Sequence, residues 1–178
     1  NIKVIEDAAH CLPTLFKGCY IGEKFSDATV FSFYATKTLT TGEGGLILSK
    51  NKKIINYIKL NSLHGINKNT YDRYIKLKKD SKYDVIDAGY KFNLTDLAAS
   101  IGLAQLKLLK KNYVSRKKIA QIYFKHLKHP LIELPKKDNL TKKNSWHLFV
   151  VKITEMQKKS RDNLVKHLIN KKIGTSLH

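Results

Sequence analysis

Short apolar runs along the chain predict four β-strands, at residues 2–6, 28–34, 46–48 and 146–153. The run at 28–34 is rich in β-branched and aromatic residues and alternates in polarity, a pattern typical of a half-buried strand. Before the third run, Thr40-Thr-Gly-Glu-Gly-Gly45 predicts a tight turn. These segments predict a sheet whose strands are joined by glycine-rich connections.

Apolar residues at helical spacing predict four helices in the remaining sequence. The clearest begins at Thr95-Asp96, which are capping residues, and its apolar stripe comprises Leu97, Ile101, Ala104 and Leu108. The other helices are expected at 53–63, 115–127 and 160–169, with Pro130 and Pro135 as breaks. The polar segment 64–92 lacks periodicity and is expected to be a long loop. Strands mixed with helices favour an α/β or α+β fold.

The chain carries 34 Lys and Arg against 14 Asp and Glu, a formal net charge of +20, but only three of the basic residues are Arg. Nucleic-acid readers usually rely on Arg for bidentate contacts. The lysines are spread along the chain, so we interpret them as solvated faces; a functional basic patch is the alternative. No specific nucleic acid is expected as a partner.

The hydropathy and the cysteine content of the chain indicate which further kinds of protein and site are not expected. No apolar run approaches the roughly 20 residues of a membrane-spanning helix, so no membrane association is expected. Cys11 and Cys19 lack a zinc spacing and are expected to be free thiols of a cytoplasmic protein, and no metal site is predicted. The first residues already form a strand-like run and the last ones a loop, so we expect the chain to be a fragment.

Three features that could take part in a reaction lie close together in the sequence. Asp7 ends the first predicted strand, Ser32 and Lys37 close the second, and the glycine turn follows. An amine at the edge of a hydrophobic core favours the neutral form that Schiff-base chemistry needs, and a carboxylate can face a pyridinium nitrogen. The residues alone leave two interpretations open: a pyridoxal-phosphate site, or an ordinary surface lysine with an acidic helix cap.

A longer set of motifs extends over essentially the whole chain. It comprises Glu6-Asp-Ala-Ala-His10, Ser26-Asp27, Phe31-Ser-Phe-Tyr-Ala-Thr-Lys37, Thr41-Gly-Glu-Gly-Gly45, His64-Gly65, Gly89-Tyr-Lys-Phe-Asn-Leu-Thr-Asp96, Ile101-Gly-Leu-Ala-Gln-Leu106, Arg116, Trp146-His147 and Gly174-Thr175. In these residues and their order the sequence resembles the DegT/DnrJ/EryC1/StrS aminotransferases, which are pyridoxal-phosphate enzymes of fold type I. The resemblance implies an α/β fold with a mixed, mostly parallel sheet. Residues 1–112 would form the later part of a large cofactor-binding domain, and residues 113–178 a linking helix and the start of a small α+β domain.

The resemblance also implies roles for single residues. Lys37 would carry pyridoxal 5'-phosphate as a Schiff base and later move the substrate proton, and Asp7 would keep the pyridine nitrogen protonated. Ser32 would bind the cofactor phosphate, Asn93 the phosphate of the neighbouring subunit's cofactor, and His10 would lie near the cofactor's phenolic oxygen.

Each of the weaker assignments has a structural alternative. His10 can be a structural residue beside a strand end, Asn93 a helix N-cap, and Ser32 a core hydroxyl that bonds the backbone. Trp146-His147 is interpreted as part of a strand in the core of the small domain, and no role is assigned to His64-Gly65.

The function implied by the resemblance is transamination, because the family's sugar dehydratases carry His where this chain has Lys37. The expected enzyme is a cytoplasmic homodimer with shared active sites. It would move an amino group, from glutamate, onto a nucleotide-linked keto-sugar for surface polysaccharide or antibiotic sugars. The branch that makes 4-amino sugars fits best. The alternative is a catalytically inactive relative that acts as a regulator or binding protein.

Overall fold

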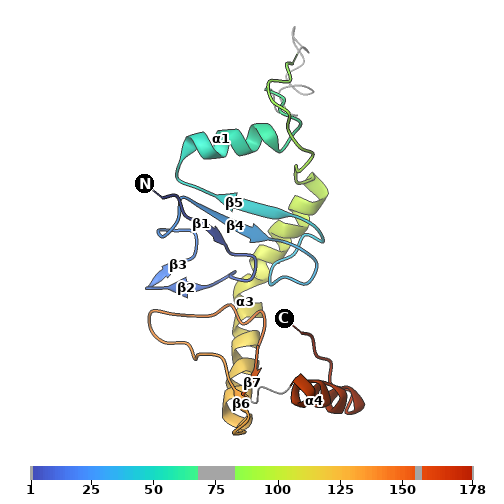
Figure 1. Ribbon diagram of the computed structural model, residues 1–178. Coiled ribbons are helices and arrows are strands. Elements are labelled where there is room, and N and C mark those ends of the chain that lie inside the picture. The colour runs from blue at the N-terminus through green and yellow to red at the C-terminus, as the bar shows by residue number, and fades with distance from the viewer. Residues whose placement is uncertain (1, 68–82, 155–157, 178) are drawn as a thin grey trace.

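The computed structural model describes residues 2–67, 83–154 and 158–177 of the chain. A three-stranded mixed sheet lies in the N-terminal part, a long helix passes behind it, and a smaller unit follows at the far end of that helix (Figure 1). The strands of the sheet are β1 (Ile5–Asp7), β4 (Ala28–Ser32) and β5 (Gly45–Leu48). The α/β fold predicted from the sequence is confirmed.

The strand order is β1-β4-β5, so β4 is the central strand. β1 runs parallel to β4, with Asp7 opposite Val30, whereas β5 is antiparallel and places Gly45 opposite Ser32. The buried residues of β4, Ala28, Thr29 and Phe31, explain why this strand has the strongest sequence signal. Among the described strands the sheet is therefore mixed, with one parallel and one antiparallel pair.

A buried polar network ties β1 to the segment that leads into β4. The carboxylate of Glu6 accepts hydrogen bonds from the hydroxyls of Ser26, at 2.8 Å, and Thr29, at 2.9 Å. Thr29 is only 1% exposed, so its hydroxyl needs this partner. Asp27 accepts from the backbone N–H of Val4 at 2.9 Å. The motif residues Glu6, Ser26 and Asp27 thus fix the strands that carry the candidate site.

Two residues between β1 and β4 form a turn that the sequence analysis did not identify. β2 (Leu15–Phe16) and β3 (Cys19–Tyr20) pair as an antiparallel hairpin. The connecting Lys17 and Gly18 have φ values of 50° and 77°, as a two-residue turn of type I′ requires. Lysine is uncommon at such a φ, so the turn had no clear sequence signal.

The helix α1 (Lys52–Asn61) agrees with the expected segment 53–63, and Asn51 caps it by accepting from the N–H of Lys53. The two helices expected at 95–108 and 115–127 are instead one helix, α3 (Asp96–His126), of 31 residues. No Gly or Pro lies between residues 108 and 115, so nothing ends the first helix. Within α3 the hydroxyl of Ser115 donates to the carbonyl of Lys111 rather than capping a new helix.

The C-terminal part contains β6 (Ile132–Glu133), β7 (Lys152–Ile153) and α4 (Lys158–Asn170). β6 and β7 pair antiparallel beside the end of α3 (Figure 1). The strand predicted at 146–153 is wrong for most of its length, because only Lys152–Ile153 is paired. Trp146 has φ of 51°, which is incompatible with an extended strand.

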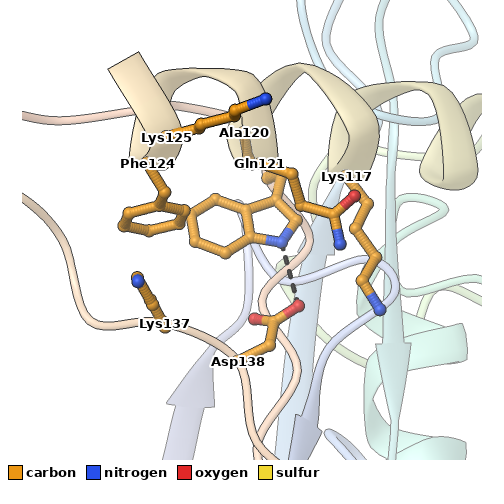
Figure 2. Close-up of a pocket in the computed structure, with 8 residues that line it drawn as sticks. Lys117, Ala120, Gln121, Phe124, Lys125, Lys137 and Asp138 are labelled. Atoms are coloured by element: carbon orange, nitrogen blue, oxygen red, sulfur yellow. Dashed lines mark hydrogen bonds between the residues drawn. The ribbon is translucent and has the colours of Figure 1, made fainter. Parts of the chain in front are cut away.

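Trp146 anchors the segment that precedes β7 against α3. Its indole N–H donates to the carboxylate of Asp138 at 3.0 Å, and its ring meets that of Phe124 at 5.5 Å. Figure 2 shows Phe124 and Asp138 at a pocket of about 390 Å³, which Lys117 and Lys137 also line. Burial of the aromatic rings stabilises this conformation over the extended strand that the apolar run suggested. The predicted burial of Trp146 is confirmed, at 6% exposure, whereas its assignment to the core of a small domain stays a prediction.

The expected long loop at 64–92 lies partly outside the described residues, which omit 68–82. Its described ends hold together through isolated bridges, Leu63 with Lys91 and Ile66 with Val85. Across the residues that the structure describes, no helix is long and apolar enough to cross a membrane.

Candidate functional site

Asp7 is the last residue of β1 and begins a tight turn. Its Oδ1 accepts from the backbone N–H of Ala9 at 3.0 Å, and the N–H of Cys11 donates to the carbonyl of Ala8 at 2.9 Å. Ala8 is buried, whereas the Asp7 side chain is exposed. No hydrogen bond or ion pair within 2–67, 83–154 and 158–177 uses Oδ2 of Asp7, so this oxygen can accept one.

Lys37 lies in a second turn, which follows β4. Its backbone N–H donates to the carbonyl of Tyr34 at 3.0 Å, and the N–H of Thr41 returns to the carbonyl of Phe33 at 2.9 Å. The Lys37 side chain is half-buried, and its amine has no hydrogen bond or ion pair within the described residues. A lysine held in a folded turn with an unengaged amine is available for chemistry.

One side-chain hydrogen bond joins the two turns. The hydroxyl of Thr38, next to Lys37, donates to the carbonyl oxygen of Leu12, which follows the turn that Asp7 begins. Because β1 and β4 are parallel, both turns also leave the sheet at the same edge. The structure therefore brings the predicted residues Asp7 and Lys37 onto two connected turns at one edge of the sheet.

Ser32 is the last residue of β4, one strand away from Asp7. Its Oγ accepts from the N–H of Tyr34 at 3.4 Å, a long contact that leaves the hydroxyl proton free to donate elsewhere. The N–H of Phe33 donates to the carbonyl of Gly44 at 2.8 Å, which places the glycine turn beside Ser32. The alternative interpretation of Ser32 as a core hydroxyl bonded to backbone thus has one long contact in its support.

Asn93 is exposed and precedes α3. The alternative that Asn93 caps the helix is wrong, because Thr95 is the N-cap and accepts from the N–H of Ala98 at 3.2 Å. Asn93 instead accepts a hydrogen bond from the Lys91 ammonium. Its neighbour Leu94 packs close to Gly44. Asn93 therefore lies near the glycine turn, and no described hydrogen bond joins it to the other four predicted residues.

His10 lies in the turn that Asp7 begins, and its imidazole ring is 4.7 Å from that of His147, edge to face. The carbonyl oxygen of His10 accepts a hydrogen bond from the hydroxyl of Ser145 at 2.6 Å. Sequence reasoning missed both partners, although the Trp146-His147 motif contained one of them. Ser145 is an isolated serine in a loop, so its role had no signal in the sequence.

The pKa values of two side chains, one at each end of β1, are shifted by their surroundings. Burial raises the pKa of the Cys11 thiol, and the negative charges of Asp7 and Glu6 raise it further, so Cys11 stays a protonated thiol rather than a nucleophile. At the other end of β1, the hydrogen bond from the Val4 N–H, followed by that from Lys3, lowers the pKa of Asp27. Within the described residues, no group of three or more potential metal ligands is present.

The side-chain groups at this edge suit pyridoxal phosphate. An unengaged oxygen of Asp7 complements a protonated ring nitrogen, and the unengaged amine of Lys37 can react with an aldehyde. The hydroxyl of Ser32 can donate to a phosphate oxygen. The donor set of the three side chains therefore fits the cofactor that the sequence resemblance implies.

Comparison with known proteins identifies relatives over the whole chain. The model of the DegT/DnrJ/EryC1/StrS aminotransferase family matches residues 1–178. The uncharacterized protein MJ1066 of Methanocaldococcus jannaschii is 41% identical over 182 residues, which cover 100% of this chain and 46% of that protein. The chain thus spans about half the length of this relative.

Solved structures, among them a putative sugar aminotransferase, share the fold. The putative sugar aminotransferase Spr1654 of Streptococcus pneumoniae, in its PMP form, is 28% identical with a TM-score of 0.84, over 99% of this chain and 43% of that one. AtS13 of Actinomadura melliaura is 30% identical with a TM-score of 0.79, over 97% of this chain and 43% of that one. Spr1654 is also known in a PLP form. The predicted family resemblance and fold type are confirmed, and the PLP and PMP forms of Spr1654 support the predicted cofactor.

Proposed function

The chain belongs to the DegT/DnrJ/EryC1/StrS aminotransferase family, and from this membership we propose that it supplies the catalytic lysine of a pyridoxal-phosphate-dependent sugar aminotransferase. The observation that carries the proposal is the pairing of Asp7 and Lys37 on two turns that the hydrogen bond from Thr38 to Leu12 connects. Each of these side chains has an unengaged polar group within the described residues. A protein that keeps the fold but catalyses no reaction has no need for both of these groups.

Bound pyridoxal phosphate supplies a ring that withdraws electrons from the bonds of a substrate amine. The carboxylate of Asp7 holds the proton on the ring nitrogen, and it is itself oriented by the N–H of Ala9. Lys37 would hold the cofactor through its side-chain amine. Once free, that amine would act as a base that takes a proton from the substrate carbon and gives it up at the cofactor's C4′ carbon.

The other predicted residues bind and orient the cofactor in this proposal. Ser32 donates its hydroxyl to the phosphate, and His10 lies beside the phenolic oxygen. Asn93 reaches the phosphate of the partner subunit's cofactor. The closeness of Leu94 to Gly44 places the segment of Asn93 beside the glycine turn, which in this proposal lies at the contact between the two subunits.

The substrate class in this proposal is a keto-sugar linked to a nucleotide, and glutamate is the amino donor. Support comes from Spr1654, which is described as a putative sugar aminotransferase. The product would be an amino sugar, of the 4-amino type, for a surface polysaccharide or an antibiotic, made in the cytoplasm.

The proposed assembly is a homodimer with shared active sites. The accessible surface of the chain is 14031 Å², whereas a folded monomer of 178 residues exposes about 9,000 Å². Apolar residues of α3 contribute to this excess, including Leu97 at 80% and Leu103 at 65% exposure. Such faces are expected to be covered by further polypeptide in the assembled enzyme.

The division into two domains remains a proposal. The large domain would end at residue 112 and the small one would begin at residue 113, but α3 runs through this boundary.

A catalytically inactive family member that acts as a regulator is the alternative. An absorbance spectrum of the holoenzyme separates the two functions. With glutamate, the enzyme should lose the long-wavelength band of bound pyridoxal phosphate, and a nucleotide-linked keto-sugar should restore it. A regulator would show no change with either compound.

A further inference from the structure

Ser145 is nearly inaccessible to solvent, with 1% exposure, yet its side chain is polar. Its hydroxyl donates to the carbonyl oxygen of His10 at 2.6 Å, across 135 residues of sequence. The same hydroxyl oxygen accepts from the N–H of His147 at 3.4 Å. A buried hydroxyl with two backbone partners fixes both segments, because losing either bond leaves a buried polar group unsatisfied.

The backbone of Ser145 is also held from a third direction. Arg116, on α3, donates from its Nε to the carbonyl oxygen of Ser145 at 3.1 Å. Arg116 is half-buried, and burial lowers its pKa. The aromatic contact of Trp146 with Phe124 anchors the next residue to the same helix. Ser145 is therefore a rigid point between α3 and the turn that follows β1.

What Ser145 holds is part of the candidate site. The His10 carbonyl belongs to the turn that begins at Asp7, in which the N–H of Cys11 closes on the carbonyl of Ala8. The His10 ring extends from this turn and meets the ring of His147 at 4.7 Å. Displacement of the His10 backbone would change both the ring pair and the orientation of the turn at the cofactor edge.

We propose that Ser145 is a positioning residue of the cofactor site, which acts by holding the backbone of His10 and with it the His10–His147 ring pair. Arg116 supports this function from α3 by holding the backbone of Ser145. The proposal rests on the proposed function, since it assigns His10 to the cofactor edge. It adds a connection between the C-terminal segment and the turn of Asp7 that cofactor contacts alone do not supply.

The test uses the holoenzyme with Ser145→Ala and, as a second variant that does not touch the buried hydroxyl, Arg116→Lys. Ser115→Ala is the matched control, because it removes an exposed hydroxyl of α3 whose hydrogen bond goes to the carbonyl of Lys111 and not to the Ser145 segment. The first measurement is the cofactor dissociation constant. The second is the rate of carbethoxylation of each histidine by diethyl pyrocarbonate, read by peptide mass spectrometry, with His64, His126, His129 and His167 as internal references.

Loss of one neutral hydrogen bond should weaken cofactor binding roughly three- to tenfold in Ser145→Ala. It should also raise the labelling rate of His10 by a similar factor, while the reference histidines stay at the wild-type rate. Arg116→Lys should change His10 in the same direction, and Ser115→Ala should change nothing. If Ser145→Ala fails to fold, Arg116→Lys decides alone.

Two results would overturn the proposal: unchanged labelling of His10 in the folded variants, or an equal rise at all histidines, which indicates general loosening. If wild-type protein itself binds no pyridoxal phosphate, the proposed function fails, and unequal labelling of His10 still reports the contact. The two failures are therefore distinguishable.

Discussion

The hydroxyl of Thr38 donates a hydrogen bond to the carbonyl oxygen of Leu12, and this contact connects the turn that carries Lys37 to the loop that follows Asp7. The two turns leave neighbouring parallel strands at the same edge of the sheet. Strand pairing alone fixes the ends of β1 and β4, whereas the positions of side chains five or more residues beyond a strand depend on such loop contacts. The relative placement of Asp7 and Lys37 therefore depends on the pairing of β1 with β4 and on the hydrogen bond from Thr38 to Leu12.

Thr38→Val should loosen this connection while preserving the shape of the side chain. Removal of one hydrogen bond is expected to weaken cofactor binding roughly three- to tenfold, because the Lys37 turn would no longer be held to the Leu12 segment. Equilibrium dialysis of the cofactor measures this change. Thr36→Val is the control, since Thr36 is exposed and lies in the same turn. Equal effects of both substitutions would show that the Thr38 contact has no special role.

Asp7→Asn should leave the cofactor bound but slow transamination by orders of magnitude. An amide has no negative charge with which to keep the ring nitrogen protonated, although it is close in size to the carboxylate. Stopped-flow spectra of the half-reaction with glutamate measure this loss directly. Turnover near that of wild type would mean that Asp7 has only a structural function in the turn after β1.

Asn93→Ala should weaken cofactor retention by about 1.5–3 kcal/mol, the range for a hydrogen bond to a charged group. Mixing this variant with Lys37→Ala under subunit exchange tests whether sites are shared. At limiting cofactor, each variant alone is expected to be nearly inactive. A heterodimer would place both lesions in one site and leave the other intact, so activity should reappear. Without recovery despite proven exchange, each chain builds its own site.

Gly44→Ala should destabilise the fold by about 1–3 kcal/mol, the usual range for a backbone held in a disfavoured conformation. Gly44 has φ of 152°, and an added Cβ would lie 2.5 Å from Oγ1 of Thr41 and 2.9 Å from Cδ1 of Leu94. Gly174→Ala is the control, because nothing lies within 4 Å of its Cβ position. Urea unfolding of both variants measures the difference. A Gly44 variant as stable as the Gly174 control would contradict the close packing of this turn.

The sequence was sufficient to predict the elements whose signal is local. β4 has the alternating apolar pattern, and Thr95 provides the cap at the start of α3. Asp7 was singled out by its place at the end of a strand and Lys37 by its place between a strand and a glycine turn, and the family resemblance supplied their predicted chemistry. These features depend on residues close to one another in the chain.

Features that depend on distant contacts were not predictable from the same patterns. The apolar run from Trp146 suggested a strand, but contacts with Phe124 and Asp138 hold Trp146 in a different conformation. The hydrogen bond between Ser145 and His10 joins residues that are 135 positions apart, and no periodicity in the sequence indicates such a pair. The continuity of α3 was also missed, although no Gly or Pro lies between the two predicted helices.

The most direct test of the central claim is the covalent position of the cofactor. The holoenzyme is reduced with borohydride, which fixes a Schiff-base-bound cofactor to its lysine, and a tryptic peptide map then locates the adduct among the 31 lysines. Lys37→Ala, reduced in parallel, is the control and should give no adduct peptide. The account predicts a single adduct on Lys37. An adduct on any other lysine, or none in a holoenzyme that retains pyridoxal phosphate, would contradict it.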